Sequence, residues 1–217
     1  MENKEKNSVM YTVGEEIFNS VSHGVGVLLS VAALVLLIIF AVIYSDGYGL
    51  AGALVYGISL ILLYTMSMVY HIVQNQTAKK VLRIFDHCSI FILIAGTYTP
   101  YLLGPLRGAL GWTIFGIIWG VTVIGIILNA VNLEKFRKLS LVCYVLMGWG
   151  IVLSIKPMLQ NIALPGIVLL GVGGIVYTVG VIFYVLKRYR YMHSIWHLFV
   201  LAGSVFHYFS ILLFVLK

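Results

Sequence analysis

Seven apolar stretches follow one another along the chain, separated by short polar connections. A helix needs about 20 consecutive apolar residues to cross the hydrocarbon core of a bilayer. Hydropathy predicts membrane-spanning helices at residues 17–44, 48–72, 82–103, 109–130, 139–156, 162–186 and 192–216. We therefore expect an all-α protein in which residues 17–217 form a single seven-helix transmembrane bundle. So little chain is left over that any chemistry must be carried by the helices and their connections.

The polar residues 1–16 form a leader before the first apolar stretch, which runs from Ile17 to Tyr44. This stretch is too long for the core of a signal peptide, and no small-residue cleavage site follows it. We therefore expect it to be retained as the first helix.

The charged residues predict the orientation of the bundle. Of the 14 Lys and Arg residues, 11 fall on the side of the leader. They are Lys4, Lys6, Lys79, Lys80, Arg83, Lys135, Arg137, Lys138, Lys187, Arg188 and Arg190. Because positively charged connections stay inside the cell, the N-terminus is predicted to be cytoplasmic and the C-terminus extracytoplasmic. This is opposite to the orientation of G-protein-coupled receptors.

The net charge of +7 therefore reports topology, and we expect no nucleic-acid partner. Cys88 and Cys143, the two cysteines, both fall in predicted helices, which excludes a disulfide framework. Glycine-rich segments such as Gly116–Gly120 and Gly171–Gly174 allow close packing of helices within the bundle or, alternatively, a homodimer interface.

Histidines provide the strongest signal for a functional site. His193 and His197 open the last helix at a spacing of four, which turns both imidazoles to one side, about 6 Å apart along the axis. His71 closes the second helix and Asp86 lies early in the third. With the predicted orientation, these residues lie at the same depth on the cytoplasmic side.

Three imidazoles with one open position are typical of a catalytic Zn²⁺ site, in which the metal activates water. Asp86 can orient that water or accept its proton, and Ser67, one turn before His71, can bond the water or a reacting oxygen. The alternative roles are structural. Asp86 would be a counter-ion for Arg83 or a histidine, and Ser67 would bond a helix carbonyl.

Other polar residues lie near the same side. Glu16, Asn19 and His23 share one face of the first helix and could support the metal ligands, form a proton path or line a substrate entrance. They could equally form an interfacial hydrogen-bonding stripe. We expect His87 to face away from Asp86, and His207, about 15 Å beyond His197, to bond a neighbouring helix or line an inner cavity.

These residues, in this order, resemble the progestin and adipoQ receptor superfamily, and within it the bacterial hemolysin III branch. The segments that carry the resemblance are Glu15–Gly24, Ser67–His71, Asp86–Phe91, Ala95–Pro100, His193–His197 and Gly203–Tyr208. The resemblance implies seven helices, a cytoplasmic N-terminus and zinc held by His71, His193 and His197, with Asp86 and Ser67 beside it. It also implies hydrolysis of ceramide-like lipid amides.

Three functions are therefore considered. The leading one is a zinc-dependent hydrolase of an amide or ester bond in a membrane lipid, located in the bacterial cell membrane. The second is a non-enzymatic membrane sensor or membrane-homeostasis factor in which zinc is structural. The third is a cytolysin, as the family name suggests.

Overall fold

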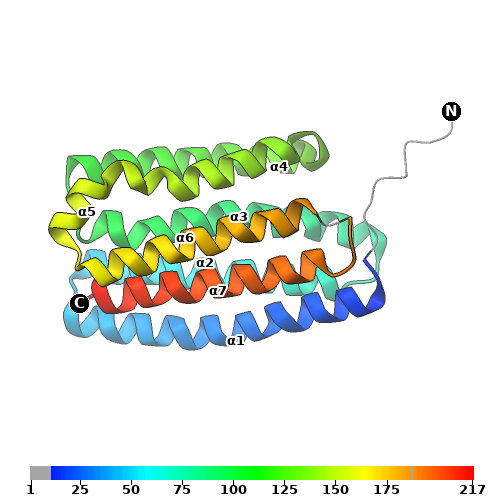
Figure 1. The fold of residues 1–217 in the computed structure, drawn as a ribbon, viewed down its shortest axis with the longest axis horizontal. Coiled ribbons are helices and arrows are strands. Elements are labelled where there is room, and N and C mark those ends of the chain that lie inside the picture. The colour runs from blue at the N-terminus through cyan, green and yellow to red at the C-terminus, as the bar shows by residue number, and fades with distance from the viewer. Residues whose placement is uncertain (1–10, 187) are drawn as a thin grey trace.

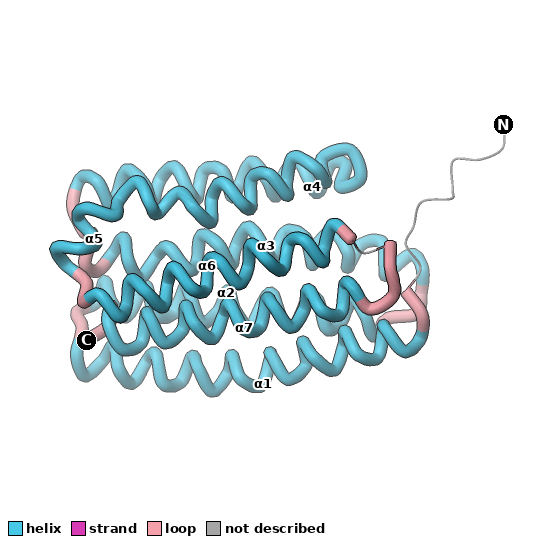
Figure 2. Tube along the Cα trace, viewed as in Figure 1, coloured by secondary structure: helices cyan, strands magenta, loops and turns pink. Residues whose placement is uncertain are grey.

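The computed structural model describes residues 11–186 and 188–217, and every regular element in these ranges is a helix (Figure 2). In chain order the elements are α1 (Val13–Tyr44), α2 (Gly47–Ile72), α3 (Gln76–Leu103), α4 (Ala109–Trp149), the 3₁₀ helix η1 (Gly150–Ser154), α5 (Ile155–Asn161), α6 (Leu164–Val185) and α7 (Met192–Phe214). Six helical segments in the described ranges are long and apolar enough to cross a membrane. The predicted all-helical membrane fold is confirmed at this level.

The segment Ala109–Asn161 counts as one of the six, although it is 53 residues long and bent. Within α4, Asn132 leaves the helical conformation (φ −160°, ψ 88°), and its side chain accepts a hydrogen bond from the Lys135 N–H at 3.0 Å. The Ser140 hydroxyl donates to Asn129 Oδ1 at 2.6 Å. Residues 11 apart in a straight helix would be separated by about 16 Å. The chain therefore doubles back at Asn132, and α4 consists of two antiparallel limbs (Figure 1).

Several helix boundaries differ from those that hydropathy predicted. α1 starts at Val13 because Thr12 and Glu15 form a reciprocal capping box. α3 starts at Gln76 because the Asn75 side chain accepts hydrogen bonds from the backbone N–H groups of Thr77 and Ala78. The expected connection at 132–138 is helical after Asn132. The expected span 139–156 ends at Trp149, where η1 and α5 continue the chain. Polar caps extend helices beyond their apolar stretches, which hydropathy does not register.

The helices run side by side, and their connections gather at the two ends of the bundle (Figure 2). α1 begins at one end and the C-terminus lies at the other (Figure 1). The outer surface is apolar: Leu28, Val131 and Leu153 are 73%, 74% and 92% exposed. Such a surface suits lipid contact.

Two glycines show how closely the helices approach. A Cβ added at Gly125 would lie 2.3 Å from the Phe91 ring, and one at Gly173 would lie 2.2 Å from the His207 ring. These glycines serve internal packing. By contrast, a Cβ at Gly116, Gly120 or Gly171 would meet nothing within 4 Å. A homodimer through glycine-rich faces stays a prediction.

Candidate metal centre

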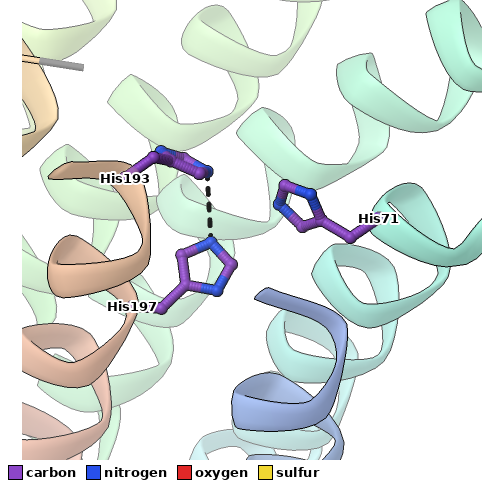
Figure 3. Close-up of side chains that lie close together, drawn as sticks. All are labelled: His71, His193 and His197. Carbon is purple, nitrogen blue, oxygen red and sulfur yellow. Dashed lines mark hydrogen bonds between the residues drawn. The ribbon is translucent and has the colours of Figure 1, made fainter. Parts of the chain in front are cut away.

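Three buried histidines meet at one end of the bundle. His71 comes from the last turn of α2, and His193 and His197 come from the first turns of α7. One ring nitrogen from each lies within 4.8 Å of the others, and the Nε2 atoms of His193 and His197 are 3.1 Å apart. Figure 3 shows the three imidazoles pointing toward a common space.

The start of α7 is held in place by α1. Tyr191, just before α7, has a left-handed backbone conformation (φ 60°), and its N–H donates to Glu15 Oε1 at 2.7 Å. A left-handed residue without a compensating contact is costly. This bond fixes where α7 begins, and therefore where His193 and His197 lie.

Glu16 on α1 orients His71. Its Oε2 lies 2.6 Å from His71 Nδ1, and its Oε1 accepts a hydrogen bond from Lys79 Nζ at 2.6 Å. Because the Lys79 ammonium favours the ionised carboxylate, His71 Nδ1–H is the donor. The lone pair of His71 is then on Nε2, which has no hydrogen-bond partner among the described residues.

Asn19 and His23 also lie beside the histidines. Ser194, next to His193, donates to Asn19 Oδ1 at 2.7 Å. The His23 ring stacks on the His197 ring, with centroids 3.7 Å apart and planes at 15°. The polar face of α1 is thus in contact with α7 at the candidate site. What Glu16, Asn19 and His23 do there stays a prediction.

A small cavity of about 30 Å³ adjoins the histidines. Its polar lining is His23, Ser67, Asp86, His87, Tyr184, His193 and His197. The structure thus brings Ser67 and Asp86 to two of the three histidines, as their predicted depth required. Their catalytic roles stay predictions. Arg83 pairs with Glu134 at 2.6 Å, and Asp86 Oδ2 lies 3.5 Å from His87 Nδ1. The alternative role of Asp86 as a counter-ion therefore remains for a histidine rather than for Arg83.

Two residues of this region were not anticipated. His87 was expected to face away from the site, but it lines the cavity, with Nε2 3.3 Å from the Tyr184 hydroxyl. The contact with Tyr184 of α6 accounts for this orientation of His87. Tyr11 stacks on His193, with centroids 4.8 Å apart, and burial raises the pKa of its hydroxyl well above 10. A tyrosine before a first helix is ordinary at a membrane interface, so this contact could not be predicted from the sequence.

A second cavity of about 130 Å³ lies deeper, between α3, the second limb of α4, α6 and α7. Its lining is mostly apolar. It shares five lining residues with the small cavity, namely Leu63, Ile90, Tyr184, Trp196 and Val200. His207 lines it too, and its Nε2 bonds the Leu170 carbonyl at 3.1 Å. Both expectations for His207 are confirmed.

The residues at the centre fit a metal ion. Two imidazole nitrogens about 2.1 Å from a tetrahedral ion lie about 3.4 Å apart, close to the 3.1 Å between His193 and His197. Glu16 fixes the tautomer of His71 that leaves Nε2 able to bind a metal. Neutral nitrogen donors suit transition metals rather than calcium or magnesium.

Comparisons with known proteins give the family and the relatives that the chain resembles. The family described as "Haemolysin-III related" matches residues 11–208. "Hemolysin-3 homolog" of Bacillus subtilis is 43% identical over 208 residues, covering 96% of this chain and 98% of that protein. "Hemolysin-3" of Bacillus cereus is 45% identical over 204 residues, covering 94% and 93%. The human "Monocyte to macrophage differentiation factor" is 33% identical over 171 residues, covering 73% and 68%.

Proposed function

The chain belongs to the Haemolysin-III-related family and is a multi-pass bacterial membrane protein, and from this premise we propose that it is a zinc-dependent hydrolase of a membrane lipid. The scissile bond is an amide or an ester. One observation carries the proposal: three buried imidazoles converge beside a polar cavity that shares its lining with a larger apolar cavity. Such an arrangement can hold a lipid tail while presenting its polar linkage to a metal.

The proposed topology has seven crossings, with a cytoplasmic N-terminus. Two features support it. The two limbs of α4 count as separate spans, and α1 begins at the end of the bundle opposite the C-terminus (Figure 1), as an odd number of crossings requires. The excess of Lys and Arg lies on the histidine side, so the positive-inside rule makes that side cytoplasmic. Lys4, Lys6 and Lys187 of that count lie outside the described residues.

In the proposed reaction, His71, His193 and His197 would hold the zinc ion. When bound, zinc polarises the reacting carbonyl and makes a water molecule more acidic. Asp86 accepts the proton of the attacking water and can return it to the leaving nitrogen or oxygen, so that a fatty acid and an amine or alcohol are formed. Ser67 donates a hydrogen bond to a reacting oxygen.

Access to the site is proposed to be through the membrane. Tyr11 packs over His193 and His71 on the predicted cytoplasmic side, with ring centroids 4.8 and 5.6 Å away. The deep cavity, in contrast, is lined by apolar side chains of α3, α4, α6 and α7. A lipid tail would suit this cavity, because the apolar lining resembles the hydrocarbon from which the tail would enter.

The test uses purified protein in lipid nanodiscs. The metal is identified by elemental analysis, and total bacterial lipid is incubated with the protein and analysed by mass spectrometry for released fatty acid. We expect about one zinc per chain, and hydrolysis that is lost in His193→Ala and after zinc removal. His207→Gln, at a histidine outside the cluster, should keep its zinc. Hydrolysis that persists without zinc would reject the mechanism.

A second candidate is a non-enzymatic membrane-homeostasis factor with structural zinc. The observation that favours it is the presence of Asp86 in a cavity of only about 30 Å³ beside the histidines, where a carboxylate could complete the metal coordination. A crystal structure with zinc bound separates the two functions, because it shows whether the fourth ligand is an Asp86 oxygen or a water molecule. Four protein ligands would favour the structural role, and three protein ligands with one water would favour the hydrolase. A lytic activity rests on the names of the Bacillus relatives alone.

A further inference from the structure

His23 is the buried histidine whose contacts the fold does not explain. Its residue is 3% exposed, and one face of its ring stacks on His197. Tyr64 approaches in a T-shaped arrangement, with centroids 5.1 Å apart and planes at 85°. Neither His23 ring nitrogen makes a hydrogen bond of good geometry with the described residues, although the His197 backbone is close enough to interact with the ring. The ring is therefore packed, but its polar atoms are not satisfied.

The other five histidines differ from His23 in this respect. Each has at least one ring nitrogen within hydrogen-bond distance of a partner: His71 of Glu16, His87 of the Arg83 carbonyl, His193 of His197, His197 of the Ser22 hydroxyl, and His207 of the Leu170 carbonyl. An imidazole carries at least one N–H in any protonation state. A buried N–H without an acceptor loses its hydration without compensation, so such groups are rare and call for a specific explanation.

The position of His23 indicates where its partner lies. It lines the small cavity together with Ser67, Asp86, His193 and His197. At about 30 Å³ the cavity holds only a few atoms, such as a water molecule or the polar group of a larger ligand. Because His23 and His197 are stacked and both line this cavity, a group that binds His23 in the cavity lies close to His197.

We propose that His23 is a substrate-binding residue whose ring N–H donates a hydrogen bond to the oxygen of a lipid carbonyl group held next to the three metal-binding histidines. The identity of that group as an amide or ester rests on the proposed function. The lipid would reach His23 from the adjoining apolar cavity, since Leu63, Trp196 and Val200 line both cavities. The contact would position the carbonyl and add specificity for an oxygen acceptor.

The experiment measures ligand binding, so it does not depend on turnover. Zinc-loaded protein in nanodiscs is titrated with palmitoyl hydroxamate, a zinc-binding analogue of a fatty amide, by calorimetry. His23→Phe keeps a flat ring that can stack on His197 but removes both nitrogens. We expect binding to weaken by about tenfold or more, the effect of losing one buried hydrogen bond, with unchanged zinc content and melting temperature.

Two amide variants and one control complete the design. His23→Asn and His23→Gln each restore an N–H at one of the two ring-nitrogen positions, and we expect one of them to bind within about threefold of wild type. Ser30→Ala on α1 should bind normally, because the Ser30 hydroxyl donates to the Gly26 carbonyl of its own helix at 2.7 Å. The control shows that a buried polar deletion in this helix has no general effect.

Each outcome decides the proposal. Wild-type affinity in His23→Phe overturns it, as does failure of the wild type to bind the hydroxamate. Loss of zinc or of folding in all three His23 variants also overturns it, because His23 would then only support His197. If binding depends on His23 but no lipid is hydrolysed, the hydrolase falls and the binding role stands. If His23→Phe hydrolyses lipid as well as the wild type does, the binding role of His23 falls and the hydrolase stands.

Discussion

Glu16 Oε2 lies 2.6 Å from His71 Nδ1, so a carboxylate of the first helix determines which nitrogen of a second-helix histidine faces the candidate metal. The same carboxylate pairs with Lys79 at 2.6 Å, at the start of α3. Three helices are thus joined through one side chain at the predicted cytoplasmic end. Carboxylate–histidine pairs of this kind orient metal ligands and raise their basicity.

Glu16→Gln should weaken zinc binding by about 10- to 100-fold, the usual effect of removing such a partner. The amide can still contact His71 but carries no charge. Competition with a chromogenic chelator measures the affinity. The matched control is Glu134→Gln, since Glu134 also pairs with a basic residue, Arg83, but is 58% exposed and does not line the small cavity. Equal zinc affinity in the two variants would show that Glu16 has no influence on the metal.

Tyr11→Ala should speed the release of zinc to an external chelator. Tyr11 stacks on His193 and, because burial keeps its pKa high, its hydroxyl stays neutral up to strongly alkaline pH. An aromatic pair contributes roughly 0.5–1.5 kcal/mol, which corresponds to about a two- to tenfold change in rate. Stopped-flow measurement of zinc transfer tests this. Tyr189→Ala, at a 65% exposed position, provides the control. An unchanged rate of zinc release in Tyr11→Ala would show that Tyr11 does not shield the metal from the chelator.

The convergence of the histidines could be predicted from the sequence because it depends on simple geometry. The spacing of His193 and His197 places them on one helical face, and the distribution of charge places His71 at the same end. The proximity of Ser67 to the site could be predicted because Ser67 lies one turn before His71. None of these inferences required knowledge of which helices are neighbours.

Other features depend on packing and could not be read from the sequence. The role of Tyr11 depends on how the start of α1 meets α7, and the contact of His87 depends on the position of Tyr184 on α6. The apolar cavity reflects incomplete filling between helices, which no single residue signals. The bend at Asn132 was recognised as a connection, but the helical conformation of the residues after it was not, because their charges lower hydropathy without opposing helix formation.

The proposed topology predicts which connections are reachable from outside the cell. In a variant without Cys88 and Cys143, a cysteine placed at Asp46 should react with a membrane-impermeant maleimide in intact cells, and one placed at Glu134 should react only after permeabilisation. The two positions are 54% and 58% exposed at their side chains, so differences in labelling report sidedness. The opposite pattern would invert the orientation, and labelling of both from outside would contradict the count of crossings.

Filling the deep cavity should affect long-chain substrates selectively. Gly174 lines this cavity, and a Cβ added there would be 3.8 Å from the Trp149 ring, an ordinary contact. Gly174→Leu should therefore fold and bind zinc, while its side chain displaces part of a lipid tail. Crowding of an occupied apolar site costs roughly 1–3 kcal/mol, so KM for a palmitoyl substrate should rise about fivefold or more and KM for a hexanoyl substrate should change little. Gly171→Leu is the matched control on the same helix, because a Cβ there meets nothing within 4 Å. Equal KM changes for both chain lengths would place the lipid tail elsewhere.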